Sequence, residues 1–362
     1  MLTLDILLQA IPNNYILKDS SAFNIQFLDS KPIFIDSLSF DEYIEGSPWV
    51  GYKQFCQHFL NPLLLMAKVD YRLGHNSKFI DGIPINLTRK LLPFRSCFNI
   101  NILMHVFFHD FSDNKFSSIN KNEVIIKKKF LKKDLLNLIL NLRDFVNSLQ
   151  LKNQKTEWQN YYNEINYHSD EFKLKKNIIK SFVINFQPKK VLDIGSNIGL
   201  FSRLASSNKV DTVSADIDHN SVNASYLRIK KKNEKNLYPI VLDISNPSSD
   251  IGWDNSEREN ILDRADADSV FALAVIHHLR ITNNIPIQMI ANFFHKATRK
   301  FLVIEFVGKN DSQVQKMLRN REDYFDDYNL HTFEKVFFQK FKLIEKISTI
   351  ANKRYIYIFK KL

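Results

Sequence analysis

A glycine-containing turn that follows a short apolar run constrains the fold more than any other feature of this sequence. The segment Val191-Leu-Asp-Ile-Gly-Ser-Asn-Ile-Gly-Leu-Phe-Ser202 has the pattern of a buried strand that enters a tight turn and then a helix. Glycine permits backbone conformations closed to other residues, so Gly195 suits the turn, and Gly199 lets the helix pack closely against the strand. We therefore expect a ligand to bind over this turn.

The residue between the two glycines indicates what kind of ligand this is. In dinucleotide-binding GxGxxG turns the middle glycine lets a pyrophosphate approach the backbone, but here Asn197 holds that position. A diphosphate is therefore disfavoured, and a nucleoside without phosphate is favoured. S-adenosylmethionine meets this requirement, and its methionine amino group would lie beside Asp193.

Two further carboxylates follow the next two expected strands. Asp216 comes 21 residues after Gly195, close to the roughly 20-residue spacing of a ribose-binding carboxylate. Asp243 could accept a hydrogen bond from the adenine amino group, while Ile244 packs on the ring. Either aspartate alone could simply cap the helix that follows it. Together with the turn, they predict a cofactor site at the carboxyl ends of three strands.

From about residue 191 onward, short β-rich runs alternate with longer helical stretches, which is typical of a parallel sheet covered by helices. Strands are expected at 190–194, 210–215, 238–242, 269–275, 301–306, 341–348 and 354–359. Only a short turn separates the last two, so they should form an antiparallel hairpin. Helices are expected at 131–149, 172–186, 199–206, 220–232, 256–263, 286–297, 311–320 and 332–338. The predicted class is α/β, with a Rossmann-like, mostly parallel, seven-stranded sheet.

The chain length favours two domains. At about 150 residues per domain, the 362 residues divide into an accessory α+β domain over 1–155 and a sheet domain over 156–362. In the accessory domain, residues 33–36 resemble a strand, and 52–68 a helix bent or interrupted at Pro62. This domain contains no motif whose chemistry can be named, although it could contact substrate.

Composition excludes several classes of protein. The chain is 44% hydrophobic and 25% charged, as expected of a globular protein. Cys56 and Cys97 form no disulfide or zinc pattern, and no apolar run approaches the roughly 18 residues that span a bilayer. No secretory signal is visible at residues 1–5. We expect a soluble, cytoplasmic protein without a membrane partner or a metal; its oligomeric state is not indicated.

The net charge of +11 could suggest nucleic acid as a partner, but its distribution weakens that interpretation. Residues 1–155 carry 19 Lys and Arg against 14 Asp and Glu, a balance of +5, which leaves +6 for the remainder. Short lysine runs at 127–129 and 230–232 are more simply explained as solvated helix faces.

Residues 188–362 resemble a class I S-adenosylmethionine-dependent methyltransferase domain. The resemblance rests on the glycine turn, on Asp216 and Asp243, and on the segment Leu273-Ala-Val-Ile-His-His-Leu279. Pairs such as Pro48-Trp49 and Gly252-Trp253 also resemble bacterial methyltransferases grouped with the NoeA host-specific nodulation protein. The resemblance implies the seven-stranded sheet, methyl transfer, and a set of residues that contact the cofactor: Asp193, Gly195, Asn197, Gly199, Asp216, Ile217, Asp243, Ile244 and Ala274.

The acceptor side of the site is expected where the fourth and fifth strands end. His277 and His278 follow the fourth strand, and either could accept a proton from a hydroxyl or merely order the loop. Glu305, at the end of the fifth strand, could bind substrate, orient a histidine or anchor a loop. Trp253 could cover the adenine or stack on a substrate ring.

Neighbouring polar residues have plainer explanations. Ser256 and Glu259 fit a helix capping box, which leaves Arg258 as a weak candidate for binding an anionic substrate. The aspartates at 323, 326 and 327 are more simply a solvated loop than a metal site.

The absence of two motifs excludes two kinds of methyl transfer. The chain lacks the Asn/Asp-Pro-Pro-aromatic tetrad of base N-methylation after the fourth strand, and the sheet domain has no cysteine nucleophile for cytosine methylation. The leading hypothesis is O-methylation, or less favoured N-methylation, of a small molecule or saccharide. The alternatives are an RNA methyltransferase and a non-catalytic S-adenosylmethionine-fold binding protein.

Overall fold

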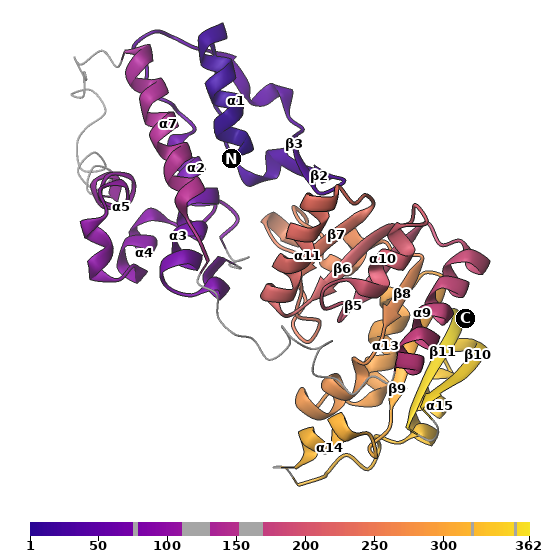
Figure 1. The fold of residues 1–362 in the computed structure, drawn as a ribbon. Coiled ribbons are helices and arrows are strands. Elements are labelled where there is room, and N and C mark those ends of the chain that lie inside the picture. The colour runs from indigo at the N-terminus through magenta and orange to yellow at the C-terminus, as the bar shows by residue number, and fades with distance from the viewer. Residues whose placement is uncertain (75–78, 111–130, 152–168, 320–321, 351–352) are drawn as a thin grey trace. The chain divides into compact units, whose positions relative to one another are not determined.

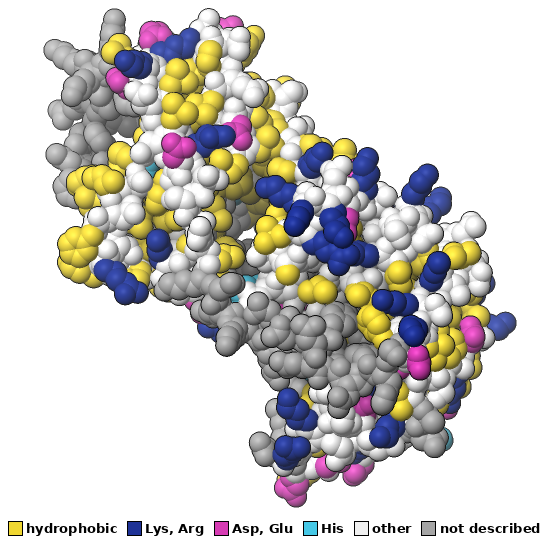
Figure 2. All heavy atoms as spheres, in the orientation of Figure 1, with side chains coloured by type: hydrophobic (Ala, Val, Ile, Leu, Met, Phe, Trp, Pro, Cys, Tyr) yellow, Lys and Arg dark blue, Asp and Glu magenta, His cyan; other side chains and the backbone are white. Residues whose placement is uncertain are grey.

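The chain divides into two compact units, Met1–Asn153 and Gln154–Leu362 (Figure 1). The computed structural model describes residues 1–74, 79–110, 131–151, 169–319, 322–350 and 353–362. The domain boundary expected after residue 155 lies outside these described residues. Lys and Arg side chains are spread over the face in view (Figure 2). No helix in the described ranges is both long enough and apolar enough to cross a lipid bilayer.

The C-terminal unit is built on a seven-stranded sheet with the order β10-β11-β9-β8-β5-β6-β7. Five neighbouring strands are parallel, and β11 runs antiparallel to both β9 and β10. The seven strands are β5 (Lys190–Ile194), β6 (Asp211–Asp216), β7 (Leu237–Val241), β8 (Ser269–Ala272), β9 (Phe301–Val307), β10 (Phe341–Ile350) and β11 (Arg354–Lys361). This arrangement confirms the predicted sheet and its terminal hairpin.

Strand order reverses at β5, because β6 and β7 lie on one side of it and β8 and β9 on the other. In open α/β sheets, ligands bind outside the carboxyl ends of the strands at such a switch point. The topology therefore places a ligand site where β5 and β8 end, next to the glycine turn.

Helices cover both faces of the sheet (Figure 1). Alternate residues of a strand point to opposite faces, so Leu192 and Ile194 pack with α13 and α15, whereas Val191 packs with α9 and α10. The helices of this unit are α9 (Ser169–Phe186), α10 (Leu200–Ser206), α11 (His219–Lys232), α12 (Ile261–Ala265), α13 (Ile287–Ala297), α14 (Ser312–Leu318) and α15 (Leu330–Phe337).

Two predictions for this unit are wrong in detail. Strand β8 ends at Ala272 rather than at residue 275, since Ala274 has a left-handed φ of 55° that a strand cannot accommodate. The capping box at Ser256 and Glu259 does not form. The N-cap of α12 is Asn260, whose side chain accepts from the backbone N–H groups of Leu262 and Asp263 at 3.0 and 3.2 Å.

The N-terminal unit combines helices with two small antiparallel sheets, as an α+β domain should. Its strands are β1 (Tyr15–Leu17) paired with β4 (Phe40–Glu42), and β2 (Ile25–Leu28) paired with β3 (Lys31–Phe34). Its helices include α1 (Leu2–Ala10), α2 (Tyr52–Phe55), α3 (Asn61–Lys68), α4 (Ile85–Leu91), α5 (Ile100–Ile102) and α7 (Lys132–Ser148).

The helix predicted over 52–68 consists of three segments. A π-helical turn, η4 (Cys56–Leu60), joins α2 to α3. Pro62 lies at the start of α3, directly after this turn, and has no backbone N–H to donate to the turn before it. The junction residues Phe55, Leu60 and Asn61 keep right-handed helical φ and ψ, so the helix is continuous and its regular hydrogen-bond pattern is interrupted just before the proline.

Candidate functional site

A cavity of about 430 Å³ opens at the carboxyl ends of the parallel strands of the C-terminal unit. Its volume lies within the range of small-molecule sites. It is lined by residues that follow or end the five parallel strands and by side chains from α9, α10, α14 and the segment after β8: Lys175, Asp193, Ile194, Gly195, Asn197, Phe201, Asp216, Ile217, Leu242, Asp243, Ile244, Ser245, Leu273, Ala274, Val275, His278, Leu279, Thr282, Asn283, Glu305 and Met317.

The glycine turn forms one wall of this cavity. Gly195 has a φ of 72°, and a Cβ added there would lie 2.5 Å from Cγ2 of Val275. Only glycine therefore fits without moving the opposite wall. Asn197 also lines the cavity, has a φ of 50°, and donates its backbone N–H to Oδ2 of Asp216 at 2.6 Å.

Gly199 lies behind the turn rather than in the cavity wall. It is the N-cap of α10 with a φ of 73°, and an added Cβ would come within 3.0 Å of Oγ of Ser214 on β6. Its role in the structure is the close approach of helix to sheet, which the sequence also predicted.

Asp193 is 2% exposed at the end of β5, where Oγ of Ser202 donates to its carboxylate at 2.5 Å. Burial raises the pKa of Asp193 to about 7, and the negative charge of Asp216 raises it further against the opposing hydrogen bond from Ser202. A carboxyl with this pKa takes up and loses a proton near neutrality. It would become fully ionised when a cation binds beside it.

Asp216 and Asp243 both line the cavity and do not cap helices. Burial raises the pKa of Asp216, and its Oδ1 accepts from the backbone N–H of Asp218 at 2.8 Å. The N-cap of α11 is Asp218 itself. Asp243 accepts from the backbone N–H and from Oγ of Ser245, at 2.8 and 2.6 Å. These bonds fix both carboxylates at the rim where β6 and β7 end.

The two histidines occupy different positions. His278 lines the cavity, and burial lowers its pKa to about 4. His277 is 3% exposed and does not line the cavity. Its pKa is lowered well below the usual value, first by burial and then by His278, Arg354 and Lys175. Both rings are therefore neutral at neutral pH, and only His278 can meet a ligand in the cavity.

Glu305 is held in a buried chain of charges. It is fully buried within β9, with Nζ of Lys175 at 2.6 Å and Nη1 of Arg354 at 3.7 Å. Lys175 also pairs with Glu171 at 3.2 Å, and Arg354 with Asp311 at 2.7 Å. A carboxylate neutralised by two cations is well suited to fix the cavity floor and poorly suited to remove a proton.

The sequence analysis did not identify Lys175 and Glu171 as site residues, although their spacing indicates a buried pair. They are four residues apart on the face of α9 that also buries Ile178, Ile179 and Phe182. Charged residues at helical spacing on an apolar face imply buried pairing.

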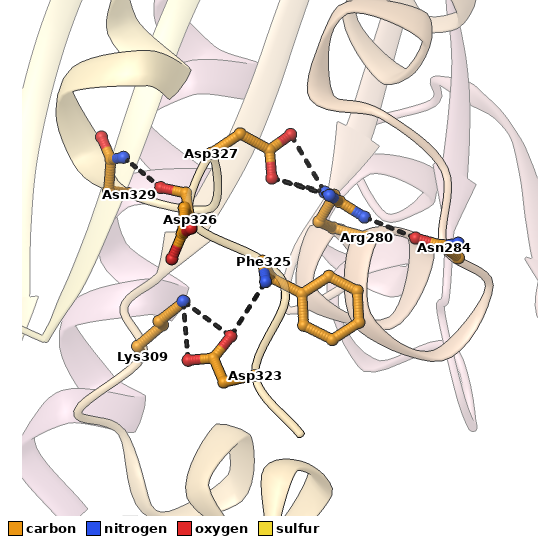
Figure 3. Close-up of polar contacts among 8 residues, drawn as sticks. All are labelled: Arg280, Asn284, Lys309, Asp323, Phe325, Asp326, Asp327 and Asn329. Carbon is orange, nitrogen blue, oxygen red and sulfur yellow. Dashed lines mark hydrogen bonds and ion pairs between the residues drawn. The ribbon is translucent and has the colours of Figure 1, made fainter. Parts of the chain in front are cut away.

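A second ion pair fixes the segment that carries His278. This segment is a π-helical turn, η9 (His278–Thr282), and Arg280 within it is 9% exposed. Its Nε and Nη2 donate to Asp327 at 2.9 and 2.7 Å, its Nη1 donates to Asn284 at 2.8 Å, and its guanidinium lies 4.7 Å from the Phe325 ring centre (Figure 3). We call this contact the Arg280–Asp327 latch.

The aspartates expected as a solvated loop are partly paired. Besides Asp327 in the latch, Asp323 accepts from Nζ of Lys309 at 2.8 Å (Figure 3). These contacts give both carboxylates a structural explanation.

No family model matches the sequence. The chain is 33% identical to the nodulation protein NoeA of Rhizobium meliloti (strain 1021) over 365 residues, which cover 99% of this chain and 76% of that protein. Among solved structures, it is similar to magnesium protoporphyrin IX methyltransferase from Synechocystis PCC 6803, with a TM-score of 0.40 and 13% identity over 62% of this chain and 99% of that chain. It is also similar to the N-methyltransferase NodS from Bradyrhizobium japonicum WM9, with a TM-score of 0.39 and 12% identity over 54% of this chain and 98% of that chain.

Proposed function

Since this chain belongs to the family of the nodulation protein NoeA, we propose that its C-terminal unit is an S-adenosylmethionine-dependent methyltransferase whose acceptor is a hydroxyl of a small molecule or saccharide. One observation carries this proposal. The glycine turn and the three carboxylates Asp193, Asp216 and Asp243 line a single cavity at the switch point of the sheet.

The residues of the cavity fit this cosubstrate. Gly195 leaves the space that a Cβ would fill, and the apolar side chains of Ile217 and Ile244 line the cavity beside Asp216 and Asp243. Asp193 would bind the methionine amino group, Asp216 the ribose hydroxyls and Asp243 the adenine amino group. When bound, S-adenosylmethionine supplies a methyl group on a positively charged sulfur.

His278 is the side chain of the cavity best placed to receive the proton of the acceptor. Its ring is neutral at neutral pH and therefore accepts a hydrogen bond from a hydroxyl. Its low pKa makes it a weak base, so we assign it the orientation of the hydroxyl and the uptake of a proton that the oxygen loses as it gains the methyl group. Glu305 and Lys175 fix the floor of the cavity below it.

The charge of the cavity favours a neutral acceptor over RNA. Besides Glu305, which Lys175 and Arg354 neutralise, its lining holds three carboxylates, Asp193, Asp216 and Asp243, and, among the described residues, no further lysine or arginine. Phosphates of a polynucleotide would be repelled at this edge, although the whole chain is basic. A saccharide or other neutral alcohol meets no such repulsion.

Calorimetry of the full chain with S-adenosylhomocysteine tests the cofactor site. Asp216→Ala should weaken binding by about tenfold or more, since it removes hydrogen bonds to a charged group. Asp211→Ala is the matched control, because Asp211 begins the same strand at its far end. Absence of binding by the natural chain, or equal affinity in both variants, would refute the assignment. A labelled-methyl assay on fractionated extract would then identify the acceptor class.

A further inference from the structure

A small hairpin between β7 and α12 presents a tryptophan to solvent. Ile251 and Arg258 form its base through two backbone hydrogen bonds of 3.1 and 3.2 Å. Trp253, in the connecting turn, is 84% exposed, more than any other large apolar side chain that the structure describes. We call residues 251–258 the Trp253 arm.

The backbone of Trp253 is tightly held. Its N–H donates to Oε1 of Glu257 at 3.0 Å, and its carbonyl accepts from the N–H and the Oγ of Ser256 at 3.1 and 2.9 Å. Gly252 has a φ of 90°, and an added Cβ would lie 2.5 Å from Cβ of Glu257. The turn therefore requires glycine beside the tryptophan.

The turn also contains backbone strain. Asp254 and Asn255 have φ values of 54° and 53°, a region that residues with a side chain enter at an energetic cost. A single exposed apolar residue on a surface is ordinary and needs no explanation. Trp253 differs because three hydrogen bonds fix its backbone on a strained turn, and such strain persists where the surrounding structure enforces it, often at binding sites.

The arm is connected to the rim of the cavity. Asp243, Ile244 and Ser245 line the cavity, and five residues, 246–250, connect them to the arm. On its other side, Asp250 accepts from the backbone N–H of Asn260, the N-cap of α12, at 2.6 Å. The arm therefore extends from the cavity-lining segment and is fixed at both of its ends.

The chemistry of the arm identifies its ligand class. Residues 250–259 contain four acidic side chains, Asp250, Asp254, Glu257 and Glu259, against one basic side chain, Arg258. An indole face stacks on the C–H surface of a ring, and carboxylates accept hydrogen bonds from hydroxyls. Asp250 and Glu257 already accept from backbone N–H groups, so the exposed Asp254 and Glu259 are the acceptors offered to a ligand. The acidic excess repels phosphate, sulfate and uronic acid groups.

We propose that the Trp253 arm is a subsite for a neutral saccharide, which holds sugar rings of the acceptor outside the cavity. The proposal rests on the proposed methyl transfer, since it assigns the class of acceptor that this transfer would use. It also gives Trp253 a role away from the adenine, because Trp253 does not line the cavity.

A glycan array probed with the full chain tests the subsite. The array would hold neutral oligosaccharides of several linkages beside sulfated and uronic-acid-containing ones. The natural chain should bind neutral glycans in preference to anionic ones, and Trp253→Ala should weaken that binding by about tenfold or more. Trp253→Phe, which keeps an aromatic face, should retain most of it. Leu227→Ala, on the exposed face of α11, is the matched control for loss of an exposed apolar side chain.

Affinity for S-adenosylhomocysteine, measured on the same samples, separates the two proposals. We expect Trp253→Ala to bind S-adenosylhomocysteine as the natural chain does. Cofactor binding without any neutral glycan binding, a preference for anionic glycans, or undiminished glycan binding by Trp253→Ala would each overturn the subsite. Glycan binding that depends on Trp253 in a chain that binds no S-adenosylhomocysteine would support the subsite and overturn the methyl transfer.

Discussion

Asp193 is the side chain whose charge depends most on what the cavity holds. Burial raises its pKa to about 7, so a fraction of the free protein carries a neutral carboxyl at physiological pH. A cationic amino group binds the ionised form. Binding below the pKa therefore requires that Asp193 release a proton, and affinity falls as the pH is lowered.

We predict that affinity for S-adenosylhomocysteine rises as the pH is raised toward about 7 and levels off above that value. The slope should approach tenfold per pH unit on the acidic side, as one released proton requires. Calorimetry in two buffers of different ionisation enthalpy measures that proton directly. Asp193→Asn should bind weakly and without this pH dependence. A flat profile for the natural chain would contradict the assigned partner.

Replacing His278 should affect turnover, whereas replacing His277 should affect stability. His278→Ala should lower turnover by about 100-fold if this ring receives the proton, with cofactor affinity unchanged. His277→Ala removes a ring that is 3% exposed, so it should lower the free energy of unfolding by about 2–4 kcal/mol. Turnover assays and denaturant titrations of both variants separate these outcomes. Full turnover in His278→Ala would remove the histidine from the mechanism.

At the scale of elements, the ion pair between α9 and β9 is a large local determinant of stability. Lys175→Met leaves Glu305 buried with one cation 3.7 Å away. We predict a loss of about 3–5 kcal/mol in the free energy of unfolding, as for other broken buried pairs. Lys175→Met combined with Glu305→Gln should recover part of this loss in urea titrations, because no unpaired carboxylate remains. A double variant less stable than the single one would show that Glu305 has other partners that matter more.

The Arg280–Asp327 latch should affect turnover rather than cofactor binding. Arg280→Met frees η9, the turn that carries His278, so we expect turnover to fall by about tenfold while affinity for S-adenosylhomocysteine is kept. Arg280→Lys should keep only part of the natural turnover, since lysine cannot form the bidentate contact with Asp327. Lys309→Met breaks the neighbouring pair with Asp323 (Figure 3) and serves as the control. Equal turnover in Arg280→Met and Lys309→Met would refute the positioning role.

The sequence predicted the parts of this unit that depend on local pattern. The strands, the glycine turn and the carboxylates at 193, 216 and 243 follow from hydrophobic periodicity and short spacings. The latch and the ion pair of Lys175 with Glu305 join residues far apart in the chain, so no local pattern contains them. The early end of β8 depends on the backbone of Ala274, a residue type that gives no sign of a left-handed turn.

At the scale of the whole molecule, the chain has a positive net charge, whereas the cavity of its C-terminal unit is lined by more carboxylates than cationic side chains. The net charge is +11, and Lys and Arg side chains are scattered over the visible face (Figure 2). We therefore expect the carboxylates at the rim of the cavity to disfavour nucleic acid there.

We predict that single-stranded RNA at low salt leaves affinity for S-adenosylhomocysteine within about twofold, and that any RNA binding disappears steeply as salt is raised. Competition calorimetry at two salt concentrations measures both quantities. RNA that displaces the ligand, or that accepts a labelled methyl group, would favour the alternative RNA methyltransferase.

The strand order has a consequence for how this unit assembles during translation. β10 emerges from the ribosome before β11, but in the finished sheet β11 lies between β10 and β9. Until β11 arrives, β10 lacks its neighbour, and Glu305 lacks the guanidinium that residue 354 brings. One late strand thus both completes the hydrogen-bonded ladder and brings the second of the two cations that neutralise a carboxylate in the interior, so the sheet is complete only once that strand is made.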